Sequence, residues 1–286
     1  MGLIDGKIAI VTGAGGGLGR SYAQALAAEG ASVVVNDFSG DAAAETVELI
    51  ASAGGMAAVN VADVGTIEGG ESVLQSALDS FGRVDILVNN AGILRDATLV
   101  KMDEQQWDEV MHVHLKALFA VTRPVFSWMK ENGDGGVIVS TTSTVGIRGN
   151  LGQTNYGAAK CGVIGFSSSL ALEGKKYGIR VWNIGPAAAT AMTAHMPEAY
   201  QRQFHIDRVG PTLLYMVSDL SGDQTGKTLL AGGGWVGECR FEVHDGYVPN
   251  DDFTPQDIAK AAADGLIFFP ERPGKWVTAY GPQRGN

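Results

Sequence analysis

Short apolar segments rich in β-branched residues alternate with longer helical patterns along most of the chain. The segments expected to form strands are Lys7–Thr12, Ser32–Asp37, Met56–Asn60, Val84–Asn89, Val137–Thr142, Ile179–Asn183 and Lys227–Ala231. The helical patterns between them include Leu18–Glu29, Ala42–Ala53, Ile67–Phe81, Asp103–Lys130 and Thr154–Lys176. Because strands and helices alternate, the sequence predicts right-handed βαβ units and one α/β domain. We expect a single doubly wound parallel sheet of about seven strands with helices on both faces.

The last part of the chain, Gly237–Asn286, differs from the rest. It is rich in Gly, Pro, Asp and aromatic residues, and Thr254–Asp264 is its one helix candidate, with Thr254 as N-cap and Pro255 at the first helical position. No linker or repeat interrupts the chain before residue 237. We therefore expect one domain over residues 1–236 and a C-terminal extension, residues 237–286, that packs on the same domain or on a neighbouring subunit.

Charge and composition exclude several classes of partner. The chain has 31 Asp+Glu against 21 Lys+Arg, a net charge of −10, and no cluster of basic residues, so we expect no nucleic acid partner. No apolar run approaches the length of a membrane span, and no secretory or peroxisomal signal is visible. These observations predict a cytoplasmic protein without a membrane partner. Cys161 and Cys239 lie far apart, and the histidines form no ligand cluster, so no metal site is predicted.

A glycine-rich turn joins the first expected strand to the first expected helix. The turn has the spacing G-x-x-x-G-x-G, formed by Gly13, Gly17 and Gly19, and Leu18 lies between the last two glycines. Glycines permit a tight turn, and the helix N-terminus that follows favours an anion such as a pyrophosphate. The alternative is an ordinary loop, but its place between strand and helix favours a Rossmann-type dinucleotide site.

The second expected strand ends at Asp37, about 20 residues beyond the glycines, where dinucleotide-binding domains place an acid that reads the adenosine ribose. A carboxylate there repels a 2′-phosphate, and no Lys or Arg lies inside the glycine turn to offset that repulsion. We therefore predict NAD rather than NADP as the cofactor. The alternative is a solvated turn residue.

Tyr156 and Lys160 lie four residues apart and hence on one face of an expected helix. Ser143 follows an apolar strand thirteen residues earlier, and Asn90-Ala91-Gly92 follows the fourth expected strand. These residues and the glycine turn all follow the carboxyl ends of strands, where open α/β sheets bind ligands. The sequence therefore predicts that they share one site.

With these motifs in order, Lys7–Ala231 resembles the short-chain dehydrogenase/reductase superfamily. The resemblance is closest to the (3R)-hydroxyacyl-CoA dehydrogenase part of peroxisomal multifunctional enzymes and to bacterial relatives. The segments that carry it are Val33–Asp37, Asn90–Asp96, Val113–Leu115, Gly152–Tyr156 and Gly232–Gly237.

The resemblance implies a role for each motif residue. Tyr156 would be the general base, Lys160 would favour its phenolate and bind the nicotinamide ribose, and Ser143 would hold the substrate oxygen. The residues matching the family's cofactor contacts are Gly13, Gly17, Leu18, Gly19, Asp37, Asp63, Val64, Asn90, Ala91, Gly92, Tyr156, Lys160, Pro186 and Thr190. Of these, Asp63 and Val64 match the adenine contact, and Pro186 and Thr190 match the loop that meets the carboxamide.

Two positions depart from the general family pattern. The fourth catalytic residue, usually Asn, is His114, which the closest subfamily shares; the alternative is a histidine that only packs in its helix. The Asn of the motif before Pro186 comes one place late, at Asn183, and Trp182 fills its position.

The leading interpretation is an NAD-dependent oxidoreductase that interconverts a secondary alcohol and a ketone. The expected substrate is apolar, such as a 3-hydroxyacyl-CoA or a hydroxysteroid, because Ala187–Tyr200 reads as a small-residue, apolar lid. The alternatives are an NADPH-dependent 3-oxoacyl carrier-protein reductase and a nucleotide-sensing protein without catalysis. The resemblance to the superfamily also implies a homodimer or homotetramer.

Overall fold

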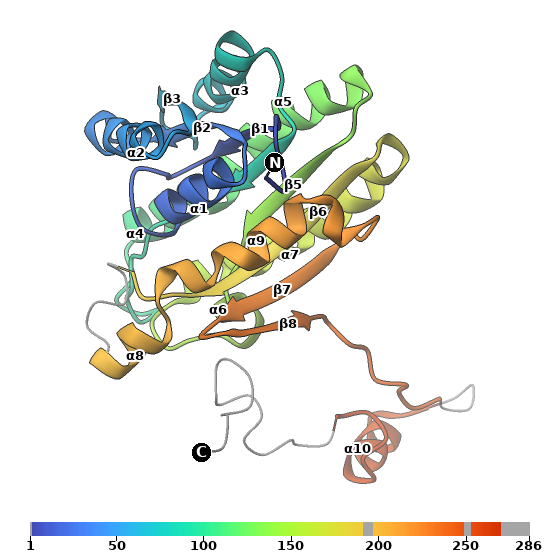
Figure 1. The fold of residues 1–286 in the computed structure, drawn as a ribbon. Coiled ribbons are helices and arrows are strands. Elements are labelled where there is room, and N and C mark those ends of the chain that lie inside the picture. Colours follow the sequence, from blue (N-terminus) through green and yellow to red (C-terminus); the bar gives the residue numbers. More distant parts are fainter. Residues whose placement is uncertain (1, 191–196, 249–252, 270–286) are drawn as a thin grey trace.

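The computed structural model describes residues 2–190, 197–248 and 253–269, and these contain one eight-stranded sheet. Its order is β3-β2-β1-β4-β5-β6-β7-β8 (Figure 1). The strands are β1 (Ile8–Val11), β2 (Ser32–Asp37), β3 (Met56–Val61), β4 (Ile86–Asn89), β5 (Gly136–Thr141), β6 (Ile179–Ala187), β7 (Lys227–Gly232) and β8 (Trp235–Cys239). All neighbours pair in parallel except β7 and β8, which are antiparallel.

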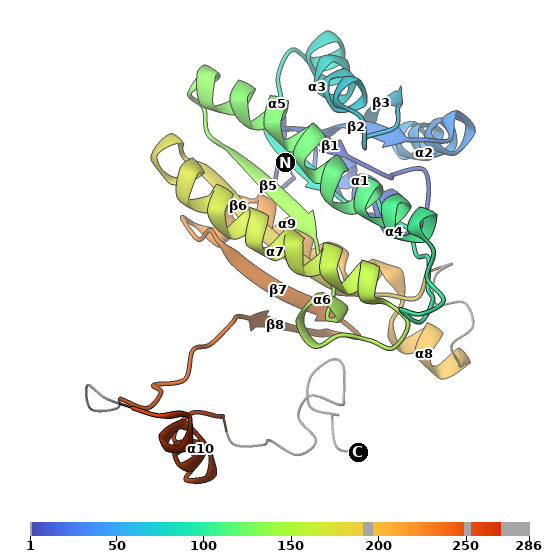
Figure 2. The same cartoon turned by 180° about the vertical axis from the view of Figure 1, so that it is seen from behind.

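Helices cover both faces of the sheet. The α-helices are α1 (Gly17–Ala28), α2 (Gly40–Ser52), α3 (Ile67–Phe81), α4 (Glu104–Met111), α5 (Ala117–Asn132), α6 (Val145–Arg148), α7 (Thr154–Gly174), α8 (Glu198–Gln203), α9 (Gly210–Val217) and α10 (Pro255–Ala263). In Figure 1, α1, α2 and α9 lie over one face of the sheet, whereas Figure 2 shows α3, α5 and α7 over the other. This is the doubly wound arrangement that the sequence predicts.

Successive strand residues point to opposite faces and so build two cores. Val33 and Val35 of β2 pack in the core under α1 and α9, together with Leu26, whereas Val34 packs in the other core with Val73 of α3. A strand buried on both faces needs apolar side chains at every position, which is why the parallel strands read as continuous Val- and Ile-rich runs.

The seven strands expected from the sequence are all present. One helix differs: the pattern Asp103–Lys130 forms α4, a π-helical turn over His112–Lys116, and α5. Asp103 caps α4 in a capping box with Gln106. A π-turn inserts one residue into the helical ladder and is frequently found at functional sites.

The chain beyond β7 contains the eighth strand, which we did not expect. It crosses the boundary placed between residues 236 and 237, so the sheet continues into the extension. Thr254 caps α10 as the sequence predicts, and both views show α10 apart from the sheet domain (Figures 1 and 2). None of the helices in the described ranges is long and apolar enough to cross a bilayer.

Candidate active site

A cavity of about 1390 Å³ lies at the carboxyl ends of the parallel strands. It extends from the β1–α1 turn to the loop after β6, and every site residue predicted from the sequence lines it. Among the residues described, no group of three or more His, Cys, Asp or Glu side chains is arranged to hold a metal ion. The cavity has two ends, one beside the glycine turn and one beside Tyr156.

The glycine turn brings the backbone of β1 and α1 close to the loop after β4. Gly13 has a φ of +62°, and a Cβ there would lie 2.8 Å from the Cα of Ala91. A Cβ at Gly19 would collide with the carbonyl oxygen of Gly13. Gly16 is the N-cap of α1 and has no side chain that could cap the helix. The backbone N–H groups at the helix N-terminus therefore face the cavity uncapped. The turn is thus shaped for close approach of an anionic group.

Asp37 lies at the end of β2 with its carboxylate held by backbone donors. The N–H of Gly15 donates to Oδ2 at 2.9 Å and the N–H of Ser39 donates to Oδ1 at 3.0 Å. The nearest cation along the chain, Arg20, pairs with Glu45 at 2.6 Å and also donates to Gly15 O. A ligand at this end therefore meets an oriented carboxylate, and the neighbouring guanidinium is already engaged.

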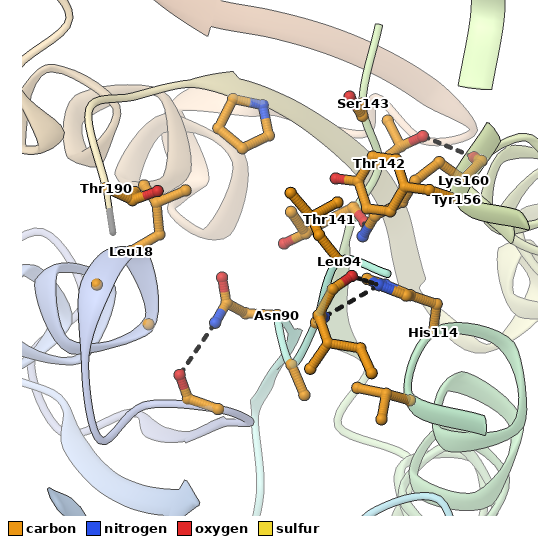
Figure 3. A pocket seen from close by; sticks show the side chains of 18 of the residues that line it. Leu18, Asn90, Leu94, His114, Thr141, Thr142, Ser143, Tyr156, Lys160 and Thr190 are labelled. Carbon is orange, nitrogen blue, oxygen red and sulfur yellow. Dashed lines mark hydrogen bonds between the residues drawn. The ribbon is translucent and has the colours of Figure 1, made fainter. Parts of the chain in front are cut away.

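Asn90 connects the loop after β4 to the glycine turn. Its side-chain amide donates to the carbonyl oxygens of Thr12 at 3.0 Å and Gly13 at 3.2 Å. Its backbone N–H bonds to Thr12 Oγ1 at 3.0 Å. Asn90 thereby fixes the floor of the cavity between its two ends (Figure 3).

Tyr156 and Lys160 lie one turn apart on α7 and both line the cavity. Lys160 Nζ donates to the carbonyl oxygen of Thr141 at 2.6 Å and lies 5.5 Å from the centre of the Tyr156 ring. Burial of the Lys160 ammonium lowers its pKa to about 7. Ser143 follows β5 in the same cavity, and its Oγ accepts the N–H of Val145 at 3.2 Å. Figure 3 shows Tyr156, Lys160 and His114 on one side of the cavity and Leu18 and Thr190 across from them.

His114, in the π-helical turn, is buried beside Tyr156. Its ring meets the Tyr156 ring edge-on, with centroids 5.3 Å apart. Its Nε2 lies 2.9 Å from the carbonyl oxygen of Ile93, whereas Nδ1 has no hydrogen-bond partner among the described residues. Burial, reinforced by the charge of Lys160, lowers the pKa of His114 to about 3, so the imidazole is neutral at physiological pH.

A second, much smaller cavity lies beside Lys160. Its volume of about 10 Å³ is close to the space that one water molecule needs. His114, Thr141 and Lys160 are among its lining residues, and Thr141 Oγ1 has no partner among the described residues. Polar groups of two strands and two helical segments therefore meet around one small cavity.

The substrate side of the cavity is held by contacts that the sequence did not reveal. Gln153 Nε2 donates to Asp96 Oδ2 at 2.9 Å, and Asn155 donates to the carbonyl oxygen of Arg95 at 3.0 Å. These bonds tie the loop after β4 to the start of the helix that carries Tyr156. They join positions that are 57 and 60 residues apart, which no local pattern could pair.

The loop after β6 is only partly described. Pro186 lies within β6, and both Pro186 and Thr190 line the cavity, as expected from the sequence. Trp182, which departs from the family pattern, is buried in the core under α1 and α9 and does not reach the cavity. Residues 191–196, six of the fourteen in the expected apolar lid, lie outside the described residues, and α8 begins at Glu198.

A comparison with protein families matches residues 7–201 to the model described as short chain dehydrogenase. The chain belongs to the short-chain dehydrogenase family. It is 43% identical over 267 residues to the peroxisomal hydratase-dehydrogenase-epimerase of Neurospora crassa, covering 92% of this chain and 29% of that enzyme. The chain thus spans about a third of the length of that relative.

Two other similar proteins match this chain over most of their length. The acetoacetyl-CoA reductase of Allochromatium vinosum is 38% identical over 80% of this chain and 98% of its own. The crystal structure of a short chain dehydrogenase from Mycobacterium avium superposes with a TM-score of 0.85 at 35% identity, covering 94% of this chain and 98% of that one. The fold and the oxidoreductase class are therefore those of the family.

Proposed function

We propose that the protein interconverts a secondary alcohol and a ketone by hydride transfer with NAD. The observation that carries this proposal is the shared cavity: Ser143, Tyr156 and Lys160 line the same space as the glycine turn and Asp37. A hydride transfer needs the dinucleotide and the alcohol in contact, and this cavity is large enough to hold both.

The residues at the glycine turn fit a dinucleotide. Gly13 and Gly19 leave no room for a Cβ, and the uncapped start of α1 suits a pyrophosphate. Asp37 supports NAD over NADP, because its carboxylate accepts ribose hydroxyls and repels a 2′-phosphate. Arg20 does not counter this repulsion, since Glu45 and Gly15 O engage its guanidinium.

The residues at the other end fit a base and a substrate clamp. When bound, the nicotinamide ring accepts the hydride from the carbinol carbon. Ser143 donates its hydroxyl proton to the substrate oxygen, and the Tyr156 phenolate takes the proton of the substrate hydroxyl. The charge of Lys160 stabilises that phenolate. Each role needs only a side chain that already lines the cavity.

The proton taken by Tyr156 then needs an exit from the site. Lys160, with a pKa near 7, can both hold and release a proton at physiological pH. The small cavity beside it has the size and the polar lining to hold a water in contact with Lys160 and His114. Because the His114 imidazole is neutral, it can accept a hydrogen bond from this water and so orient it.

For the substrate, we propose a 3-hydroxyacyl thioester, with a hydroxysteroid as the second choice. The match to an acetoacetyl-CoA reductase supports a thioester, and apolar side chains such as Ile93, Leu94 and Val145 line the cavity on the side of Tyr156. Asp37 argues against the NADPH-dependent carrier-protein reductase, and the complete set Ser143, Tyr156 and Lys160 argues against a purely sensing role.

We also propose a homodimer or homotetramer. Trp107, Phe119 and Leu172, on α4, α5 and α7, are apolar and exposed in the single chain. The C-terminal extension would pack on the sheet domain or on a neighbouring subunit, and α10 exposes Ile258 for such a contact. Light scattering of the full chain measures the oligomer, and a monomer would contradict this part.

The decisive experiment is an NAD⁺ reduction screen over 3-hydroxyacyl-CoAs of several chain lengths, hydroxysteroids and simple secondary alcohols. The 3-hydroxyacyl-CoAs should give the highest kcat/KM, with NAD⁺ preferred over NADP⁺. Faster reduction of an acetoacetyl thioester with NADPH than with NADH would overturn the cofactor assignment. Binding of NADH without turnover of any alcohol would favour the sensing role.

A further inference from the structure

His112 forms a contact at the nucleotide end of the cavity that the proposed chemistry does not use. Its Nε2 lies 2.9 Å from Oδ2 and 3.1 Å from Oδ1 of Asp63, so one ring N–H spans both carboxylate oxygens. The two residues are 49 positions apart, and both line the cavity. The pair therefore joins the π-helical turn to the loop after β3.

Packing against Gly65 fixes the direction of the imidazole. A Cβ at residue 65 would collide with Nε2, Cδ2 and Cε1 of His112, so the ring occupies the space that any larger residue would fill. The N–H of Gly65 also donates to Asp63 Oδ1 at 2.9 Å. The ring and the backbone amide thus hold the carboxylate from two directions.

The carboxylate keeps acceptor capacity on the cavity side. Oδ1 receives the Gly65 N–H and part of the His112 N–H, whereas Oδ2 receives only His112. A carboxylate oxygen accepts two hydrogen bonds, so Oδ2 can take a second donor. Burial alone would raise the pKa of Asp63, but the hydrogen bonds from His112 and Gly65 lower it, so the group is ionised and acts only as an acceptor.

We propose that His112 is a positioning residue that orients Asp63 to accept the exocyclic amino group of the adenine ring. This inference rests on the proposed function, because it assumes a dinucleotide in the cavity. The contact of Asp63 with adenine is what the resemblance to the family implies. The new element is that discrimination against a purine without the amino group depends on His112, a residue that need not touch the ligand. Hypoxanthine has a carbonyl oxygen in place of the amino group, so at that position Asp63 would face an acceptor instead of a donor.

The test compares binding of NAD⁺ and nicotinamide hypoxanthine dinucleotide by isothermal titration calorimetry. The variant His112→Phe keeps a ring over Gly65 but removes the donor, whereas His112→Gln keeps an N–H that can reach Asp63. His205→Phe is the matched control, because it removes an exposed His–Asp pair, His205 with Asp207 at 3.4 Å, whose histidine does not line the cavity.

We expect the wild-type protein and His205→Phe to bind NAD⁺ about tenfold more tightly than the hypoxanthine analogue. His112→Phe should weaken NAD⁺ binding about fivefold and leave the analogue nearly unchanged, which removes most of the preference. His112→Gln should restore part of it. Asp63→Ala, which removes the acceptor, should abolish the preference whether residue 112 is His or Phe.

Several results would overturn the inference. Equal weakening of both dinucleotides in His112→Phe would indicate a purely structural effect, and an unchanged preference in that variant would exclude any positioning role. If His112→Phe does not fold, a wild-type preference that Asp63→Ala leaves intact is enough to reject the inference. A wild-type protein that binds neither dinucleotide rejects the proposed function, whereas one that binds both equally rejects only this inference.

Discussion

The two ends of the cavity satisfy their polar groups in opposite ways. At the nucleotide end, Asp37 and Asp63 are each held by backbone N–H groups, and Asn90 bonds to two carbonyl oxygens. At the catalytic end, His114 Nδ1 and Thr141 Oγ1 are buried without a partner in the described part of the chain. Both ends belong to one cavity, yet of the two only the catalytic end has buried side-chain polar atoms without a partner among the described residues.

The difference indicates that the catalytic end lowers the stability of the fold, because it keeps buried polar groups that can take part in proton transfer. Buried polar groups are normally hydrogen-bonded, and a buried cation such as Lys160 is destabilising unless neutral or paired. Perturbed pKa values of this kind gather at functional sites. A site that must recognise a ligand is best built rigid and satisfied, whereas a site that must move a proton needs groups whose protonation is poised to change.

Replacing Tyr156 by Phe separates the two ends most sharply. We expect kcat to fall by about a thousandfold, because the phenolate that accepts the substrate proton is lost while the ring remains. Binding of NADH, measured by fluorescence titration, should stay within about twofold, since the nucleotide end does not depend on the hydroxyl. Unchanged turnover would remove Tyr156 from the mechanism, and lost NADH binding would show that the two ends are not independent.

Replacing Lys160 by Met tests how much the buried lysine at the catalytic end lowers the stability of the fold. The measure is the pH dependence of the free energy of unfolding. The pKa of Lys160 is about 7 in the folded protein, against about 10.4 in an unfolded chain. Between these values the unfolded state binds more protons, so the wild type gains stability as pH rises.

The free energy of unfolding of the wild type, relative to that of Lys160→Met, should rise by about 2–3 kcal/mol between pH 7.5 and 9.5, as measured by urea unfolding without cofactor. A pH-independent difference between the two proteins would show that the folded protein does not depress the Lys160 pKa.

Replacing Asp37 by Ser perturbs the nucleotide end alone. Loss of the repelling carboxylate should move the ratio of kcat/KM for NAD⁺ over NADP⁺ about tenfold toward NADP⁺. Adding Glu45→Gln should move it further, because Arg20 then loses its carboxylate partner. Asp41→Ser, also on this side but absent from the cavity lining, serves as the control. No change in the ratio would mean that Asp37 does not read the ribose.

Replacing His114 by Asn should have the smallest effect, and this effect on stability should appear at acidic pH. The pKa of His114 is about 3 when folded and about 6.5 when unfolded, so the wild type loses stability as pH falls through this interval. The Asn variant lacks that loss, and the difference between the two proteins should change by about 1 kcal/mol between pH 6.5 and 5.5. A constant difference in calorimetric unfolding experiments would mean that His114 titrates normally in the fold.

The sequence predicted the parallel sheet well because its central strands are buried on both faces. Val33-Val34-Val35 must be apolar at each position, and such runs are visible without any knowledge of the partners. It did not predict β8, which is an edge strand that begins directly after a glycine turn and contains Gly237. Its pairing depends on β7 being present beside it.

The site residues that the sequence singled out all line the cavity, because most lie in motifs that directly follow a strand, and Tyr156, Lys160 and His114 lie on helical segments that reach it. The contacts between those residues were not predictable from the sequence. His112 and Asp63 come together only because the π-helical turn docks against the loop after β3, and the hydrogen-bond shift that makes this turn leaves no trace in the apolar pattern. The roles of the lining residues stay predictions until they are measured.

The antiparallel return of β8 also decides how the protein can be fixed to a solid support. Thr228, near the start of β7, pairs with Cys239 at the end of β8, so the chain leaves the sheet at the end opposite the cavity. A tether attached just beyond Cys239 leaves the mouth of the cavity open to dissolved substrate. On a bead or a biosensor electrode, the reactive end would then face the bulk liquid and the anchored end the surface.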